Sequence, residues 1–277
     1  GGIYILGYCC WIHKYALEHN IDKILFLARD GDIYQKIYSQ LFQDIPFDYV
    51  YWSRIANIKY SIDDMKYYFF KEVLYHKVKN NMDFTIEALL ESLDLQLLLD
   101  DLDKYNLKKT DIIVSENVKQ IENYLNSHFS TIINKFQESS PVVNEYFYSK
   151  INNCKNIAVV DVGWAGTGPL GIKKLIEDKW QCNVHCLLAA CIVPDNITNQ
   201  YEVLSDMVQG YLFSRTHNRN LYDGHQNTWK NIYFELFTQA PYPSFSGFSN
   251  SIDESVLFDI PEVENYSIIR EIQVGID

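Results

Sequence analysis

The chain has 277 residues, 47% of them hydrophobic, which is an ordinary globular composition with enough residues for a large core. Its formal net charge is −12, and its 24 lysines and arginines are scattered rather than gathered in a basic stripe. This charge pattern argues against nucleic-acid binding. No apolar run reaches the length of a membrane span, so we expect a cytoplasmic protein that does not cross a membrane.

The first part of the chain predicts a helix, a strand, a second helix and a second strand, at residues 4–20, 23–31, 32–42 and 47–54. Both strands are apolar runs with polar ends. The first leads into Arg29, Asp30 and Gly31, and the second into Ser53 and Arg54. A guanidinium group binds two phosphate oxygens at once, in a bidentate contact, so we expect the residues at these strand ends to contact phosphate. The alternative is that Arg29 and Asp30 pair only with their neighbours.

Residues 63–150 are predicted to be helical throughout. Amphipathic spacing indicates helices at 65–79, 85–93, 95–105, 116–136 and 142–151. So many helices between two strands predict an insertion, a lid or cap beside the sheet. The expected α/β core then comprises residues 1–62 and 151–277.

The stretch at residues 157–176 combines a strand, a glycine-rich loop and a helix. An apolar run ends at Asp161, and Pro169 lies where a first helical residue tolerates proline. Glycines let the backbone approach a ligand, and the unpaired N–H groups at a helix start favour anions. Asp161 is a candidate for a ribose hydroxyl, a metal such as Mg²⁺ or a proton. Phosphate binding is predicted for Gly163, Trp164, Gly166, Thr167 and Gly168.

The remainder predicts strands at 184–193 and 209–217, helices at 229–240 and from 268, and an irregular loop at 241–248. Glu235 is an acidic residue within an apolar run, which indicates a paired or functional side chain. The sequence contains four potential zinc ligands close together, Cys182, His185, Cys186 and Cys191. Strand alternation would point Cys186 and Cys191 to opposite faces, so no metal site is assigned there.

Together these elements predict an α/β fold with a mainly parallel sheet, Rossmann-like or phosphoribosyltransferase-like, and a large helical insertion. In such a sheet, ligands bind outside the carboxyl ends of the strands. Asp30 and Asp161 are therefore the candidate catalytic residues.

The chain resembles bacterial HAD-superfamily hydrolase-like proteins that are encoded among surface-polysaccharide biosynthesis genes. The resemblance rests on a Phe-Leu-Ala-Arg-Asp-Gly loop, a Ser-Arg strand end, a Val-Asp-x-Gly-Trp-x-Gly-Thr loop and a Glu-Leu-Phe…Pro-Ser…Gly segment, at 26–31, 53–54, 160–167 and 235–247. It implies an upstream HAD-like domain, and the chain, which starts without methionine, is expected to be a piece of a longer protein. The HAD nucleophile motif, an aspartate pair before a threonine, does not occur in this sequence.

A looser resemblance is to type I phosphoribosyltransferases. Residues 29–31 are similar to their pyrophosphate loop, and residues 161–168 to their Thr-Gly-rich phosphate loop. That family has two acids before the second loop, whereas this chain has only Asp161. The resemblance implies transfer at an anomeric carbon.

Two functions follow as hypotheses. One is an enzyme-like domain that binds a phosphorylated sugar or nucleotide sugar, with glycosyl or phosphoribosyl transfer, or a share in a HAD-type hydrolase, as its chemistry. The other is a non-catalytic module that docks a HAD or glycosyltransferase protein, in which Arg29 and Asp161 would form an internal ion pair. The sequence names neither the sugar nor the acceptor.

Overall fold

The computed structural model describes residues 1–60, 62, 66–79, 83–192, 207–225, 230–240, 244–248, 257–258 and 266–274. The chain forms two compact units. The first, here called the α/β unit, comprises Gly1–Asn57, Asn144–Gly247 and Val256–Asp277. The second, the helical unit, comprises Ile58–Val143 and Phe248–Ser255. The sequence places these boundaries near residues 63 and 150.

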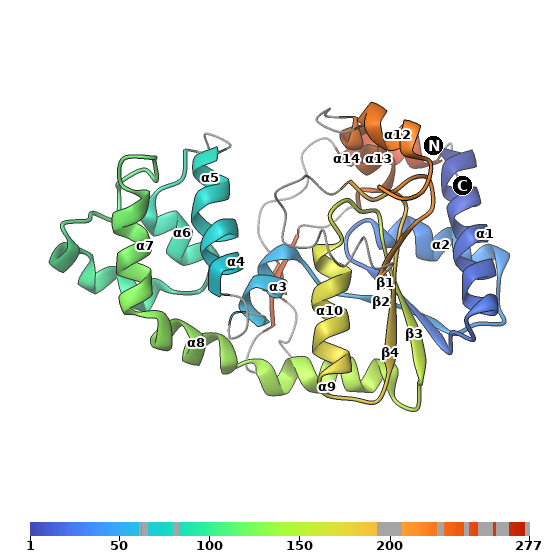
Figure 1. Ribbon diagram of the computed structural model, residues 1–277, viewed down its shortest axis with the longest axis horizontal. Coiled ribbons are helices and arrows are strands. Elements are labelled where there is room, and N and C mark those ends of the chain that lie inside the picture. The colour runs from blue at the N-terminus through green and yellow to red at the C-terminus, as the bar shows by residue number, and fades with distance from the viewer. Residues whose placement is uncertain are drawn as a thin grey trace. The chain divides into compact units, whose positions relative to one another are not determined.

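The α/β unit is built on one parallel sheet (Figure 1). Its strands lie side by side in the order β2-β1-β3-β4-β5. Their bounds are Lys23–Leu27 for β1, Phe47–Val50 for β2, Asn156–Asp161 for β3, Asn183–Leu188 for β4 and Val208–Gly210 for β5. The predicted α/β fold with a Rossmann-like parallel sheet is confirmed. This strand order reverses direction between β1 and β3, which is where ligands bind in open sheets of this kind.

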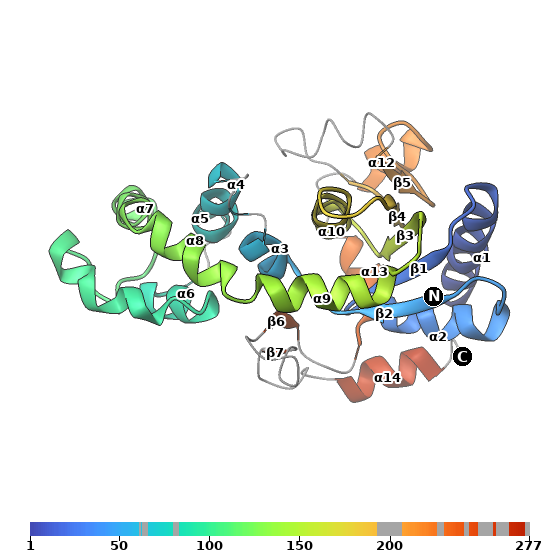
Figure 2. The same cartoon turned by 90° about the horizontal axis from the view of Figure 1, so that it is seen from below.

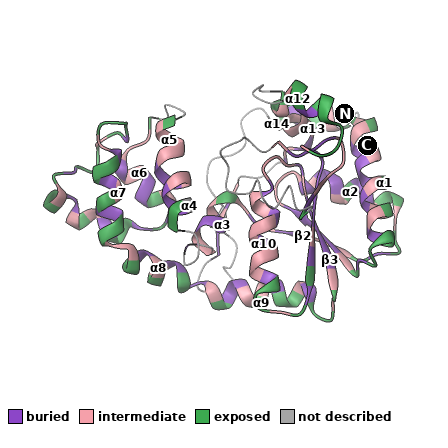
Figure 3. Cartoon of the chain, viewed as in Figure 1, coloured by how far each residue is buried: buried purple, intermediate pink, exposed green. Residues whose placement is uncertain are grey.

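Helices cover both faces of the sheet. Helices α1 (Gly2–Glu18) and α2 (Gly31–Leu41) lie on one face and α10 (Thr167–Glu177) on the other (Figures 1 and 2). The central strands are therefore buried along nearly their whole length, as Figure 3 shows. Burial on both faces explains why β1 and β3 are continuous apolar runs instead of alternating ones.

The core beneath α1 and α2 is rich in aromatic rings. Tyr8 of α1 lies edge-on to Tyr34 of α2, with ring centroids 5.0 Å apart, and both side chains are fully buried. The Tyr8 hydroxyl donates to the backbone oxygens of Asp161 and Leu187, at 2.9 and 3.0 Å. This tyrosine therefore links α1 to backbone carbonyls at the carboxyl ends of β3 and β4.

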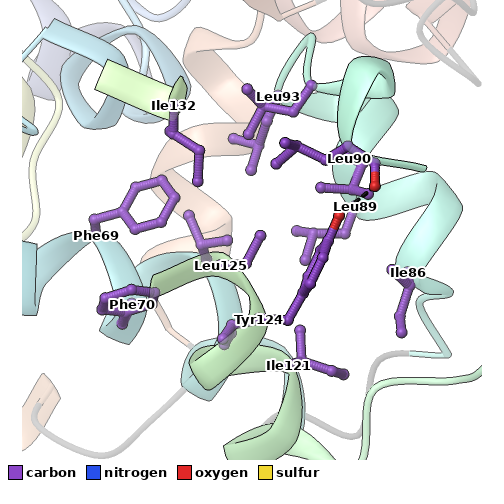
Figure 4. Close-up of a cluster of buried hydrophobic side chains, with 14 of the residues drawn as sticks. Phe69, Phe70, Ile86, Leu89, Leu90, Leu93, Ile121, Tyr124, Leu125 and Ile132 are labelled. Carbon is purple, nitrogen blue, oxygen red and sulfur yellow. Dashed lines mark hydrogen bonds between the residues drawn. The ribbon is translucent and has the colours of Figure 1, made fainter. Parts of the chain in front are cut away.

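The helical unit is held together by its own apolar core (Figure 4). Leu90, Leu125 and Phe69 are among the side chains that fill it, all at most 1% exposed. Its helical segments are α4 (Lys66–Phe70), a π-helical turn (Lys71–Tyr75), α5 (His76–Lys79), α6 (Ile86–Ser92), a 3₁₀ helix (Gln96–Tyr105), α7 (Val118–Ser127) and α8 (Phe129–Gln137).

One predicted helix of this unit is divided in the structure. The sequence predicts a single helix over 116–136, but α7 ends at Ser127 and α8 begins at Phe129. His128 leaves the helical conformation between them, with φ −102° and ψ 11°. Its Nδ1 lies 3.0 Å from the Tyr124 carbonyl, so the ring shields a backbone group at the end of α7.

Helix α3 (Arg54–Tyr60) and helix α9 (Ser140–Ile151) carry the chain between the two units. The last part of the chain adds α12 (Arg219–His225), α13 (Asn231–Thr238), α14 (Tyr266–Val274) and the antiparallel pair β6 (Phe245–Gly247) and β7 (Leu257–Phe258). No helix in the described part of the chain is long and apolar enough to cross a membrane.

The predicted strand at 209–217 is mostly replaced by a turn. Strand β5 ends at Gly210, and the Ser214 hydroxyl oxygen accepts the N–H groups of Thr216 and His217, at 3.3 and 3.1 Å. Backbone hydrogen bonds still join residues 211–213 to residues 188–191, and the turn at Ser214 then takes the place of the last part of the predicted strand. The predicted strand at 184–193 likewise ends at Leu188, and Val193 lies outside the described residues.

Candidate functional site

The candidate site lies at the carboxyl ends of β1 and β3. These strands are neighbours, and Phe26 lies opposite Val160. Leu27 and Asp161, the last residues of the two strands, therefore stand at the same edge of the sheet. The structure thus brings the Arg29–Asp30 loop and the Asp161 loop together at the point where the strand order reverses.

The first turn of α10 lies against the same edge. A Cβ atom placed on Gly168 would stand 3.5 Å from Leu27 Cδ1, 3.7 Å from Asp161 Oδ2 and 3.9 Å from Trp52 Cδ1. The start of α10 thus contacts residues at the ends of β1 and β3 and just beyond β2. Gly166 precedes the helix with φ 72°, and no side chain caps it. An uncapped helix start directed at a strand edge suits an anion.

Two glycines are required by close packing in these loops. Gly163 has φ 145°, and a Cβ there would stand 2.5 Å from the Ala190 carbonyl oxygen. Gly31 is buried at the start of α2, where a Cβ would stand 2.8 Å from the Phe26 carbonyl carbon. Both positions therefore exclude side chains. The peptide bonds Ala28–Arg29 and Gly163–Trp164, one in each loop, are cis.

Both candidate catalytic aspartates have raised pKa values. Burial raises the pKa of Asp161 to about 8, and the negative charges of Asp30 and Glu235 contribute to this, whereas the Val162 N–H, 2.8 Å from Oδ1, opposes it. Burial also raises the pKa of Asp30, to about 6. Asp161 therefore keeps its proton to a higher pH than Asp30. Carboxyl groups with separated pKa values are the usual basis for acid and base roles.

The guanidinium of Arg29 is held beside this pair without a fixed partner. Its charge lowers the pKa of Asp30, yet no hydrogen bond or ion pair of its side chain occurs with any residue that the structure describes. Arg29 is half-buried, so its charge is partly shielded from water. A half-buried cation at this edge is suited to an anionic ligand.

Ser53 and Arg54 have other surroundings. The Ser53 hydroxyl oxygen accepts the Ala56 N–H at 3.1 Å, which caps the start of α3. Arg54 is the first residue of that helix and is exposed. Trp52, which precedes them, is the residue from this segment that contacts the start of α10.

The sequence predicts a helix at 229–240, which is α13, but it does not place this helix at the site. Its Glu235 accepts the Trp164 indole N–H at 2.7 Å, and its Thr238 hydroxyl donates to Asp30 Oδ1. Glu235 could be singled out in the sequence because it is an acidic residue within an apolar run. Nothing in the local pattern distinguishes Thr238. Trp164 is further packed edge-on against Phe234, with ring centroids 5.5 Å apart.

The residues at this edge do not provide a metal centre on their own. Within the described ranges, no group of three or more His, Cys, Asp or Glu side chains is placed to hold a metal ion. What the residues do provide is a cation, a helix start, a proton donor and a proton acceptor.

No protein-family model matches the chain, and a search of curated proteins also gives no match. No relative found in these comparisons therefore supplies a function for the strand-end loops.

Proposed function

We propose that the α/β unit binds a phosphorylated sugar or nucleotide sugar at the carboxyl ends of β1 and β3. The observation that carries this proposal is the half-buried Arg29 guanidinium, which has no side-chain partner among the described residues and lies at the same sheet edge as the uncapped start of α10. Phosphate is the ligand group that both features favour. The sugar hydroxyls would face Asp30 and Asp161.

Transfer at the anomeric carbon is the chemistry we propose for this arrangement. The bond from the anomeric carbon to the phosphate oxygen breaks, and Arg29 and the N–H groups of α10 stabilise the departing phosphate. An acceptor hydroxyl forms the new bond to that carbon and loses its proton to the ionised Asp30. Asp161, which has the higher pKa of the two, donates a hydrogen bond to a sugar oxygen. A place in surface-polysaccharide biosynthesis is inferred from the motif resemblance alone.

The competing function, a non-catalytic docking module, predicts that Arg29 and Asp161 form an internal ion pair. No such pair occurs between these two described residues. This difference favours the ligand-binding function.

The test is a thermal-shift and calorimetric screen with phosphoribosyl pyrophosphate, sugar 1-phosphates and nucleotide sugars, each with and without Mg²⁺. At a ligand concentration one hundred times the Kd, binding should stabilise the protein by about 2.7 kcal/mol. Arg29→Gln should abolish this shift. Arg270→Gln removes the same charge from an exposed position on α14 and should retain it. A folded protein that no member of the panel stabilises would contradict the proposal and favour docking.

A further inference from the structure

Helix α13 contacts both loops of the candidate site through two side chains one turn apart. Glu235 and Thr238 are separated by three positions, so they lie on the same face of the helix. Glu235 holds Trp164 of the glycine-rich loop, and Thr238 holds Asp30 of the loop after β1. One face of α13 therefore joins two loops that come from different strands.

The Thr238 contact is specific for the carboxylate. The residue is 0% exposed, and its hydroxyl also lies 3.3 Å from the Phe234 and Glu235 carbonyl oxygens of its own helix. The distance to Asp30 Oδ1 is shorter than either of these, so the single hydroxyl proton is directed at Asp30. A fully buried threonine hydroxyl needs such a partner.

The position of α13 is itself fixed from α14. The Gln273 side-chain amide donates to the Gln239 carbonyl at 2.9 Å and to the Phe237 carbonyl at 3.3 Å. These bonds satisfy carbonyl groups at the end of α13 that have no partner within the helix. The two side chains therefore project from a helix that is anchored at its end.

We propose that Glu235 and Thr238 are positioning residues of the ligand site, in which Glu235 orients the Trp164 indole over the glycine-rich loop and Thr238 orients the Asp30 carboxylate. This inference rests on the proposed function. It adds α13 as the element that sets the geometry and the charge of the aspartate pair.

The two residues act on Asp30 in opposite directions. The negative charge of Glu235 raises the pKa of Asp30, whereas the hydrogen bond from Thr238 lowers it. The charge of Arg29 also lowers the pKa of Asp30, and the charge of Asp30 in turn raises the pKa of Asp161. Tyr4 and Tyr34 face it from α1 and α2, and the charge of Asp30 raises the pKa of both hydroxyls.

The experiment measures the pKa of the Asp30 carboxyl by carbon NMR in the ligand-free protein. Glu235→Gln keeps an oxygen acceptor for the indole but removes the charge, so the Asp30 pKa should fall. Thr238→Val keeps the side-chain shape but removes the donor, so the Asp30 pKa should rise, and Thr238→Ser should restore it. A disturbance that only admits water would lower the pKa in both variants, because burial is its largest cause. A fall or no change in Thr238→Val would therefore overturn the proposal.

The Glu235 contact is tested through the nitrogen-bound proton of the Trp164 indole, assigned with a Trp164→Phe variant. Its resonance should move in Glu235→Ala and stay near its original position in Glu235→Gln, since only alanine removes the acceptor. An unmoved resonance in Glu235→Ala would overturn the assignment. If Glu235→Ala does not fold, Glu235→Gln and Thr238→Val still decide the outcome through the Asp30 pKa.

Ligand affinity provides the link to function and is measured separately. With phosphoribosyl pyrophosphate as the probe, loss of either positioning contact should weaken binding on the order of tenfold, as is usual when a side chain that orients a ligand-binding residue is removed. The NMR measurements need no ligand. Failure of the probe to bind wild-type protein would thus count against the proposed function, and unchanged resonances would count against the role of α13.

Discussion

The two units of this protein bury different kinds of side chains. The helical unit fills its core with aliphatic and aromatic residues, and its charged groups form surface pairs such as Lys109–Glu87 and Lys119–Glu122. The α/β unit instead places two carboxyl groups where burial and neighbouring negative charges raise their pKa values. Burying such groups costs free energy, whereas filling an apolar core gains it. The helical unit thus gains stability from its packed core, whereas the sheet edge gives up some stability, as is expected of the ligand site that we propose there.

The largest effect should come from the packed core of the helical unit. Leu90→Ala removes a fully buried side chain and should destabilise the protein by about 2–5 kcal/mol. Chemical denaturation measures this change. Leu97→Ala, at a leucine that is 50% exposed in the same unit, is the matched control and should cost less than about 0.5 kcal/mol. Equal costs at both positions would mean that this core does not carry the stability of the unit.

A comparable loss is expected in the glycine-rich loop, but for a backbone reason. Gly163→Ala must place a methyl group 2.5 Å from the Ala190 oxygen at φ 145°, which should cost about 1–3 kcal/mol. Gly224→Ala is the control, because nothing lies within 4 Å of its added Cβ. Thermal unfolding of the two variants compares them directly. If Gly163→Ala were as stable as Gly224→Ala, the close approach to Ala190 would not exist in solution.

The pH dependence of stability should distinguish the sheet edge from the core. Asp161 has a pKa of about 8 in the folded protein and 3.8 as its ordinary value, so the folded state binds the proton more tightly. Its contribution therefore favours folding at low pH and is lost progressively as the pH rises from about 4 to about 8. Asp161→Asn mimics the protonated form and should become more stable than the wild type above this range.

The expected gain for Asp161→Asn is about 1–3 kcal/mol at pH 8, and it should shrink toward pH 4. Denaturant unfolding at several pH values measures it. Asp103→Asn changes an exposed aspartate of the helical unit and should alter stability by less than about 0.5 kcal/mol throughout. A gain for Asp161→Asn that is largest at acidic pH would reverse the sign and refute the electrostatic argument.

The smallest effect on stability, with a clear effect on binding, is expected at Gly168. An alanine there makes only ordinary contacts, with Asp161 Oδ2 at 3.7 Å, and it should stabilise the start of α10 by roughly 0.5–1 kcal/mol. The added methyl group would occupy the place where the proposed phosphate approaches the helix. A stabilised variant with weakened binding of the ligand found in the screen is expected, and unchanged affinity would place the phosphate elsewhere.

Much of the α/β unit could be predicted because its signals are local. The apolar runs of β1 and β3, the glycines after β3 and the helix pattern of α10 each lie within a few residues of one another. Burial on both faces leaves a continuous apolar run in the sequence, and this pattern is readable without the rest of the chain. The split at His128 and the turn at Ser214 were not predicted, because both involve contacts of a side chain with the backbone.

The candidate site was predicted in part for the same reason. Arg29, Asp30 and Asp161 each follow an apolar strand, and parallel strands bring their ends to one edge. Ser53 was predicted as a phosphate ligand, and in the structure its hydroxyl caps α3. Both roles suit a serine at the end of a strand, so the local pattern does not separate them.

The sequence by itself determined most of the strands and helices around the site and that polar residues follow β1, β2 and β3, because hydrophobic periodicity is a local property. Only the tertiary structure decided that β1 and β3 are neighbours and that Thr238 meets Asp30, 208 positions away in the chain. The tertiary structure also decided that the charge of Glu235 raises the pKa values of both Asp30 and Asp161. The physical reason is that desolvation and charge repulsion depend on distances in space, and the folding of distant segments sets those distances.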